Sequence, residues 1–201
     1  MKQILIATSN PGKFNQMIGF LNQLDFEFLN LKNFPEIIEE PEESGETFEE
    51  NALIKAQFYF EKTKIPTIAE DSGILVDALP GELGVKTRRW GAGAKASDEE
   101  WITFFLDKMK EVPQSHRRAN FISNIVFYNG NEIKIFKGEC KGEITKSLEA
   151  EIKEGIPLSS CFRPEGYDRV YSALGLEEKM EVSHRGKAAK NLMEFLLTFQ
   201  T

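Results

Sequence analysis

The opening segment of the chain restricts the possible folds more than any other, because an apolar run, a turn and an amphipathic pattern follow one another directly. Residues 3–8 are rich in Ile and Leu, and residues 9–12 (Ser-Asn-Pro-Gly) have the composition of a turn. We expect a buried strand, a loop and a helix that begins near Lys13, an order typical of an α/β fold. The helix would bury Phe14, Met17, Ile18, Leu21 and Leu24, which recur at helical spacing.

A capping box predicts a second helix. In residues 47–50 (Thr-Phe-Glu-Glu), the hydroxyl and the last carboxylate can each accept an orphan backbone N–H of the first turn. The helix would run to about Lys62. Asn51 and Lys55 are four residues apart and share one face, so both can point toward a site. The apolar face would consist of Phe48, Ala52, Ala56 and Tyr59.

The middle of the chain alternates between apolar runs and loop signals. Residues 67–76 are typical of a strand that is interrupted by a tight polar turn, Glu-Asp-Ser-Gly, at residues 70–73. Residues 80–96 are rich in Gly and include Arg88-Arg89-Trp90, which favours a long, ordered, functional loop. Ser97 then begins another helix.

A hairpin is predicted in the second half of the chain. Asn129-Gly130 separates the apolar runs 121–128 and 133–138, and this dipeptide is the strongest short-range signal for a hairpin. A hairpin favours a mixed sheet over a purely parallel one. The last helix is expected from about Gly186 to Phe199.

Composition excludes several classes of function. A chain of 201 residues fits a single domain, residues 1–201, and a net charge of −7 disfavours a nucleic-acid partner, whose phosphates are bound by Lys and Arg. No stretch approaches the roughly 20 apolar residues of a membrane helix, and residues 1–7 are too short for a signal-peptide core. We therefore expect a cytoplasmic protein with no membrane partner. Cys140 and Cys161 have no metal-like spacing and are expected to be reduced thiols.

Three groups of residues could carry chemistry. The turn at residues 8–13 precedes a helix, whose N-terminus attracts phosphate, and it ends in Lys13, although its spacing is not that of a Walker A loop. Asp71, with the acidic residues 39–43, could hold a divalent cation or orient a water. Residues 178–187 include His184-Arg185, which could bind a base edge or a phosphate. Each group alone is more often a turn or a solvated surface.

The three groups together make the chain similar to the family of inosine and xanthosine triphosphate pyrophosphatases, which remove deaminated purine nucleotides. The resemblance spans nearly the whole chain. It rests on ATSNPGK (7–13), EESGETFEENALIKA (42–56), AEDSG (69–73), LPGELGV (79–85) with the following Thr-Arg-Arg, and EEKMEVSHRGKA (177–188).

The resemblance implies a role for individual residues. Asp71 would be catalytic and activate the attacking water, and Asp71 and Glu42 would hold Mg²⁺. The loop after the first strand would bind the phosphates and sugar of a purine nucleoside triphosphate, and His184 and Arg185 would lie near its base. The substrate-binding positions would be Thr8, Ser9, Asn10, Pro11, Gly12, Lys13, Asn51, Lys55, Ser72, Glu165, Gly166, Tyr167, Asp168, Lys179, His184 and Arg185.

The resemblance also implies a reaction and a fold. Water would attack the α-phosphorus and pyrophosphate would leave, with positioning and charge neutralisation supplying most of the acceleration. The fold would be an elongated mixed β-sheet flanked by helices, with two lobes and a central substrate cleft, as in inosine triphosphatases and Maf-like proteins. A homodimer is the common state of the family.

The chain departs from the family pattern near the expected base pocket. Members usually carry Gly-Phe-Gly-Tyr-Asp-Pro, whereas Glu165 stands here at the place of the stacking aromatic and Arg169 at the place of the Pro. Glu70 replaces the first Asp of its motif and Leu83 a typical Pro. Two alternatives therefore stand beside the leading one: the same chemistry on a modified or standard base, or a non-catalytic nucleotide-binding relative.

Overall fold

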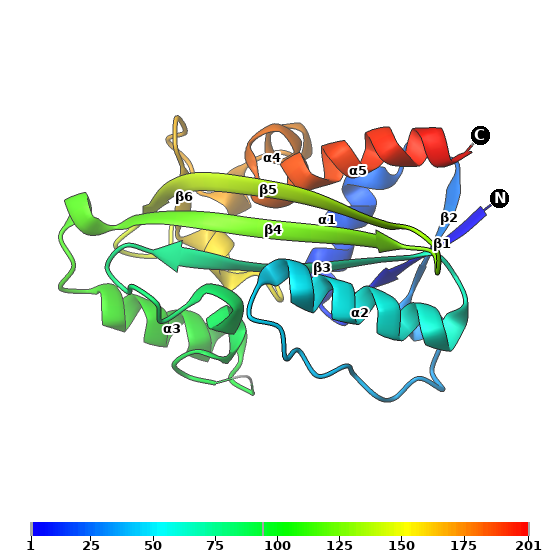
Figure 1. Ribbon diagram of the computed structural model, residues 1–201. Coiled ribbons are helices and arrows are strands. Elements are labelled where there is room, and N and C mark those ends of the chain that lie inside the picture. The colour runs from blue at the N-terminus through cyan, green and yellow to red at the C-terminus, as the bar shows by residue number, and fades with distance from the viewer. Residues whose placement is uncertain (1, 94, 201) are drawn as a thin grey trace.

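The apolar run near the N-terminus forms strand β1, which pairs with a parallel strand on each side. This computed structural model describes residues 2–93 and 95–200, in which six strands form one sheet in the order β2-β1-β3-β4-β5-β6 (Figure 1). All other neighbouring strands are antiparallel, so the predicted mixed sheet is confirmed. The strands are β1 (Lys2–Ala7), β2 (Phe26–Asn30), β3 (Thr67–Val76), β4 (Arg118–Tyr128), β5 (Ile133–Ile144) and β6 (Phe162–Pro164).

Three positions included in the predictions above lie outside the described residues. Met1 and Thr201 end the predicted domain, and Ala94 belongs to the predicted Gly-rich loop. Within the described part of that loop, residues 84–89 form a short 3-10 helix, η2 (Gly84–Arg89).

Strand β1 ends well before its neighbour β3. The two strands pair only between residues 5–7 and residues 67–69, whereas β3 continues to Val76. On its other edge, β3 pairs with β4 along its whole length. The part of β3 beyond Ala69 therefore has an edge that β1 does not cover.

The predicted turn at residues 70–73 is wrong, because these residues continue β3. Their backbone pairs in register with β4, from Glu70 opposite Ile125 to Gly73 opposite Ile122. The pairing prevails over the turn preference of an Asp-Ser-Gly sequence. Because strand side chains alternate between faces, Glu70 and Ser72 point to one side of the sheet and Asp71 to the other.

Helices cover both sides of the sheet. Helix α2 lies on one side and α1, α4 and α5 on the other, while α3 lies toward the opposite end of the sheet from the two termini (Figure 1). None of the described helices is long and apolar enough to cross a membrane. The helices are α1 (Pro11–Leu21), α2 (Phe48–Thr63), α3 (Asp98–Met109), α4 (Leu176–Val182) and α5 (His184–Gln200).

The helices begin where their capping residues stand. The Asn10 side chain accepts a hydrogen bond from the Lys13 N–H, so α1 already begins at Pro11. Thr47 and Glu50 form the predicted capping box of α2. Helix α5 begins before the predicted Gly186, and the Ser183 hydroxyl accepts the N–H of that glycine.

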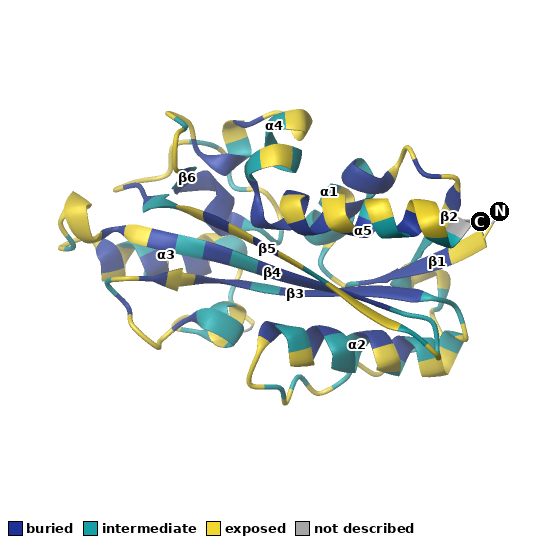
Figure 2. Ribbon diagram, turned by 45° about the horizontal axis from the view of Figure 1, so that its top comes forward, coloured by how far each residue is buried: buried dark blue, intermediate teal, exposed yellow. Residues whose placement is uncertain are grey.

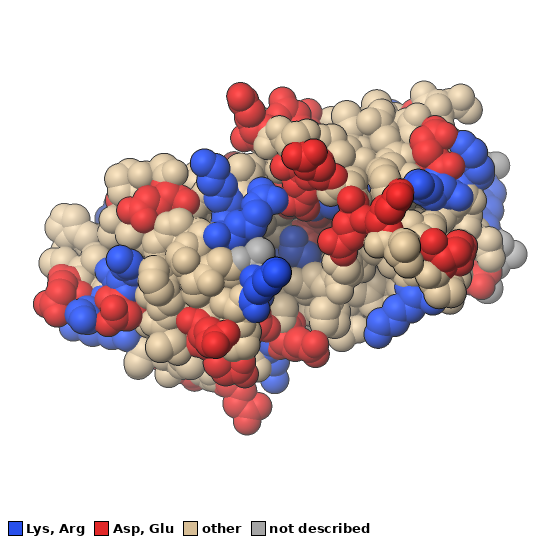
Figure 3. Space-filling view, turned by 90° about the horizontal axis from the view of Figure 1, so that it is seen from below, with Lys and Arg blue, Asp and Glu red and all other residues tan. Residues whose placement is uncertain are grey.

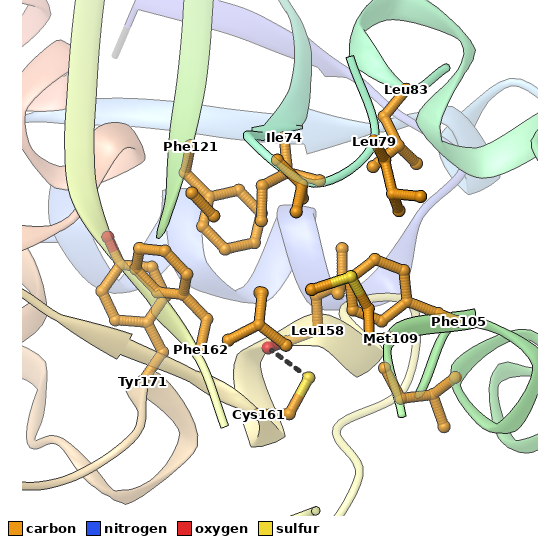
Figure 4. Close-up of a cluster of buried hydrophobic side chains, with 14 of the residues drawn as sticks. Ile74, Leu79, Leu83, Phe105, Met109, Phe121, Leu158, Cys161, Phe162 and Tyr171 are labelled. Atoms are coloured by element: carbon orange, nitrogen blue, oxygen red, sulfur yellow. Dashed lines mark hydrogen bonds between the residues drawn. The ribbon is translucent and has the colours of Figure 1, made fainter. Parts of the chain in front are cut away.

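Separate apolar clusters support the two ends of the molecule. One joins α3 to the far ends of β3, β4 and β5, and includes Phe105, Phe121, Phe162 and Tyr171 (Figure 4). The others pack α1 and α5 on one face of the sheet and α2 on the opposite face. Figure 2 shows the buried residues concentrated along the strands and on the inner sides of the helices.

Helix α5 packs directly on the backbone of β5 at Gly138, and this contact generates a test of the packing. A Cβ atom there would collide with the His184 carbonyl oxygen and lie 2.8 Å from the Ala188 nitrogen. We expect Gly138→Ala to lower the free energy of unfolding by about 1–3 kcal/mol, as overpacking does in other proteins. Urea denaturation followed by circular dichroism measures this change.

Gly19→Ala is the matched control, because Gly19 lies inside α1 and an added Cβ would meet only the side chain of Leu176, at 3.2 Å. Alanine favours a helix interior over glycine, so this variant is expected to be at least as stable as the parent. Equal denaturation midpoints for the two variants would contradict the described packing of α5 on β5.

Candidate active site

A cleft of about 670 Å³ opens at the end of β1 and along the uncovered edge of β3. The chain leaves β1 toward β2 on one side, while β3 lies on the other side of β1. Such a switch in strand order leaves a crevice at the carboxyl ends of parallel strands, which is where α/β proteins bind ligands. The predicted central cleft is therefore present, and its position follows from the strand order.

The loop after β1 forms one wall of the cleft. Asn10 caps α1 with its side-chain oxygen and donates from its amide nitrogen to the Gly155 carbonyl oxygen at 2.8 Å. The N-terminus of α1 therefore faces the cleft, where it favours anions. Lys13 also lines the cleft; burial lowers the pKa of its ammonium, although Glu70 and Asp71 raise it. A phosphate beside Lys13 would favour the charged form.

Asp71 lies in a chain of alternating charges. Its carboxylate accepts hydrogen bonds from Lys55 at 3.1 Å and from the Asn51 amide at 3.4 Å. The Lys55 ammonium also donates to Glu43 at 2.9 Å, and Glu43 accepts from Arg89 at 3.2 Å. These contacts run from Arg89 through Glu43 and Lys55 to Asp71. They thus connect η2 and α2 to β3.

The pKa shifts along this chain follow from burial and from the neighbouring charges. Burial and the nearby Glu43 raise the pKa of Asp71, and Lys55 and Lys13 only partly offset this. Burial alone would lower the pKa of Lys55, but Asp71 and Glu43 together raise it. Burial also opposes the charge of Glu43, but Lys55 and Arg89 keep its pKa below the ordinary value.

A second charge network lies on the other face of β3. The Arg185 guanidinium donates through Nε to both carboxylate oxygens of Glu70 at 2.9 Å, and through Nη2 to the Ser72 hydroxyl at 3.3 Å. It also donates to Gln16 Oε1 through Nη1, and Ser123 donates to Glu70 at 2.9 Å. Burial opposes the charge of Glu70, yet Arg185 and Lys13 hold its pKa well below its usual range. The network therefore holds α5 against β3.

His184 lies beside this network as a neutral, stacked ring. Its imidazole is parallel to Phe121 at 4.7 Å between centroids and also stacks on Tyr171 at 6.0 Å. Burial and the positive charge of Arg185 lower its pKa well below 6.5. Its Nδ1 atom is buried and has no hydrogen-bond partner among the described residues. A neutral His next to a fixed Arg suits the recognition of uncharged polar groups on a ligand.

Most of the predicted site residues meet in this cleft. Gly12 lies in the first turn of α1, and the Asn51 amide donates to Asp71. The predicted residues that line the cleft are Thr8, Ser9, Asn10, Pro11, Lys13, Lys55, Asp71, Ser72, Lys179, His184 and Arg185.

The other predicted residues do not line the cleft. Glu42 is exposed, and its neighbour Glu43 is the carboxylate that reaches Lys55. Residues 165–168 follow β6; Glu165, Gly166 and Asp168 are exposed, while Tyr167 packs against the apolar cluster of α3. The roles implied for these residues stay predictions.

Sequence reasoning missed several residues of the cleft. Gln16 follows Lys13 by three positions in α1, a spacing that places both on one helix face and could have indicated it. Glu43 belongs to an acidic run in which no local pattern distinguishes one carboxylate from the next. Arg88 lines the cleft because η2 packs beside β3, whereas the sequence indicated only that it belongs to a functional loop.

The donor set fits the magnesium ion that the resemblance implies. No group of three His, Cys, Asp or Glu residues in the described part of the chain could hold a metal by itself. Mg²⁺ usually takes one or two protein carboxylates and completes its shell with waters and substrate phosphates. Asp71 and Glu43 contact the same Lys55 ammonium from two sides, so two carboxylates are within reach of one bound cation.

Comparison with known proteins agrees with this geometry. Residues 4–195 match the Ham1 family. The chain belongs to the Ham1 family. It is 36% identical to a dITP/XTP pyrophosphatase of Oceanobacillus iheyensis, over 98% of this chain and 100% of that protein. It is 34% identical to a dITP/XTP pyrophosphatase of Thermus thermophilus, over 96% and 90% of the two chains.

Solved structures of Ham1 proteins share the fold. The Ham1 protein of Coxiella burnetii matches with a TM-score of 0.81 and 31% identity, over 98% of this chain and 100% of that chain. The Ham1 protein of Staphylococcus aureus matches with a TM-score of 0.80 and 33% identity over the same shares. The fold implied by the resemblance is therefore confirmed.

The buried Glu70–Arg185 pair predicts a large effect on stability. Glu70→Gln keeps the size of the side chain but leaves the Arg185 charge uncompensated at a site where both side chains are 4% exposed. We expect a loss of about 3–5 kcal/mol in the free energy of unfolding, the range for breaking a buried pair. Urea denaturation at pH 7 measures it.

The matched control is Glu149→Gln, which breaks a pair with Arg163 at 2.7 Å between partners that are 36% and 30% exposed. Its expected loss is below about 1 kcal/mol. Because the folded-state pKa of Glu70 is lowered, its contribution is present above the ordinary pKa of 4.5 and is lost as the pH falls below it. The difference between the parent and Glu70→Gln should therefore shrink in acid; a constant difference would contradict the ionised pair.

Proposed function

We propose that this protein hydrolyses deaminated purine nucleoside triphosphates, namely dITP, ITP and XTP, to the monophosphate and pyrophosphate, and so cleans the nucleotide pool. The observation that carries the proposal is the position of Asp71, which lies beside Lys55 and Asn51 and lines the same cleft as Lys13 at the N-terminus of α1. The names of the relatives support the same substrate class.

Substrate binding would depend on charge and on the direction of α1. The free N–H groups at the start of α1 and the Lys13 ammonium would bind phosphate oxygens. Lys55 already contacts Asp71 and would bring a second positive charge to the phosphates. Phosphoryl transfer needs little covalent help, so these residues act mainly by position and by charge neutralisation.

Asp71 would hold the attacking water in line with the bond to the leaving pyrophosphate. Its carboxylate is fixed from two sides by Lys55 and Asn51, which leaves it little freedom to turn away. Asp71 and Glu43 would hold magnesium, which when bound neutralises phosphate charge and lowers the pKa of a bound water. Glu42, the metal ligand implied by the resemblance, is adjacent in sequence.

The base would lie at the end of the cleft formed by α5. The Arg185 guanidinium is held by Glu70 and Gln16 and can donate to the 6-oxo group that hypoxanthine and xanthine share. Adenine carries an amino group there, which donates and would meet another donor. This arrangement supports selection of a 6-oxopurine.

A second candidate is the same reaction on a modified or standard base. It is favoured by residues 165–168, which do not line the cleft and in which Glu165 stands where the resemblance implies an aromatic ring that stacks on the base. Phe121 and Tyr171 are the aromatic residues next to His184 in the cleft and could contact a base instead.

One assay distinguishes these functions. Pyrophosphate release would be measured with magnesium over a panel of standard, deaminated and modified triphosphates; we expect dITP, ITP and XTP to be the best substrates. Preference for another base would establish the second candidate, and no turnover of any nucleotide would leave only a binding protein.

Asp71→Asn tests the assigned role of the carboxylate. The amide keeps the shape but cannot accept a proton from water, so kcat should fall by at least about 100-fold, the lower range for a general base. Asp25→Asn, at an exposed carboxylate outside the cleft, is the control and should keep the parental rate. Unchanged activity in Asp71→Asn would refute the role.

The assembly of the protein is a separate proposal. The single domain over residues 1–201 and the homodimer implied by the resemblance stay predictions, as does the absence of nucleic-acid and membrane partners. Light scattering on the purified chain measures the oligomeric state; a monomer at micromolar concentration would contradict the homodimer.

A further inference from the structure

The cations of the cleft fall into two groups. Lys55 is paired with the carboxylates of Glu43 and Asp71, and Arg185 is paired with that of Glu70. The remaining cations that line the cleft form no ion pair with any residue in ranges 2–93 and 95–200; they are Lys13, Arg88 and Lys179. Lys13 and Lys179 already have proposed roles, whereas Arg88 has none.

Arg88 is held beside the open edge of β3 by its neighbour Thr87. The Thr87 hydroxyl accepts the Ile74 N–H at 3.2 Å and donates to the Gly84 carbonyl oxygen at 2.6 Å. A Cβ atom at Gly73 would lie 2.7 Å from that hydroxyl, so η2 can pack here only because residue 73 is glycine. The short helix is therefore pressed against β3 two residues beyond Asp71.

The contacts of Arg89 indicate which end of the cleft η2 adjoins. Its guanidinium donates to Glu43, which in turn contacts Lys55, the lysine beside Asp71. The η2 helix thus adjoins the part of the cleft where the phosphates would lie. His184, at the expected base end, belongs to α5 on the other side of β3. Figure 3 shows Lys and Arg side chains gathered around a hollow in this face.

The Arg88 side chain is anchored, but most of its hydrogen-bond donors have no partner within the described residues. Within the described residues its single hydrogen bond runs from Nη2 to the Ala96 carbonyl oxygen at 2.6 Å. A guanidinium has five N–H donors in a planar fork that matches two oxygens of one phosphate. The anchored and exposed Arg88 therefore keeps donors free for an anion in the cleft.

We propose that Arg88 binds the terminal phosphates of the substrate and therefore the pyrophosphate that leaves. The inference rests on the proposed function and adds a residue to its phosphate site. The cleft also contains the carboxylates Glu40, Glu43, Asp71, Asp98 and Glu154, so a polyanion needs every available cation there. Arg88 supplies one from η2, and it holds the end of the substrate that carries most of the charge.

Arg88→Ala tests the proposal in the full-length protein with magnesium. A charge-assisted hydrogen bond lost from a binding site typically weakens binding by about 10-fold or more. We expect the KM for dITP and the inhibition constant of inorganic pyrophosphate both to rise by about 10-fold. The inhibition constant of dIMP should stay unchanged, because the monophosphate lacks the groups that Arg88 binds. Arg88→Lys should recover part of the affinity, since it keeps the charge without the fork.

Lys86→Ala is the matched control. Lys86 is an exposed cation of the same 3-10 helix, but it does not line the cleft. Its removal changes the net charge equally and should leave all three constants at the parental values. A similar rise in both variants would mean a long-range charge effect and would overturn the proposal.

Two further outcomes also overturn it. An unchanged inhibition constant of pyrophosphate in Arg88→Ala would show that Arg88 does not contact the terminal phosphates. A change in the preference between dITP and dATP, without a change in pyrophosphate affinity, would place Arg88 at the base. If the parental protein does not hydrolyse any triphosphate, the proposed function fails first; binding of inorganic pyrophosphate to parent and variant, measured by calorimetry, then still tests Arg88.

Discussion

The short strand β1 ends at Ala7, whereas its neighbour β3 runs to Val76, and every feature of the cleft depends on this difference. The chain leaves the sheet where β1 stops, so the loop that begins α1 faces the free edge of β3. That edge carries polar residues on both faces. A crevice between parallel strands thus becomes a site with a helix N-terminus on one side and carboxylates on the other.

The alternation of side chains along β3 divides the site into two charge networks. Asp71 points toward α2 and joins Lys55 and Asn51, whereas Glu70 points toward α5 and joins Arg185. Burying charges is costly unless they are paired, and each network satisfies this requirement with opposite charges. One network would handle phosphate and water and the other would hold an arginine for the base. Adjacent residues of one strand can therefore serve different chemistry.

The region where this chain departs from related sequences lies at the edge of the sheet. Residues 165–168 follow β6, and Arg169 is paired with Glu178 at 2.6 Å. The cleft wall next to His184 consists instead of Phe121 and Tyr171, which belong to the apolar cluster of α3. Leu83 and Trp90, which flank η2, belong to or pack against this same cluster, so one core supports both the wall beside His184 and the wall formed by η2.

The sequence by itself determined the elements whose signals are local. The turn after β1, the capping box of α2, the start of α3 after Ser97 and the Asn129-Gly130 hairpin depend on neighbouring residues, and each formed where the pattern predicted it. Most of the site residues that the family motifs implied also line the cleft. Only the tertiary structure decided that residues 70–73 continue a strand, because the ladder with β4 outweighs a local turn preference. It also decided that Glu43 and Arg88 reach the cleft, since contacts between distant segments depend on packing; Gln16 had a local signal in its spacing from Lys13.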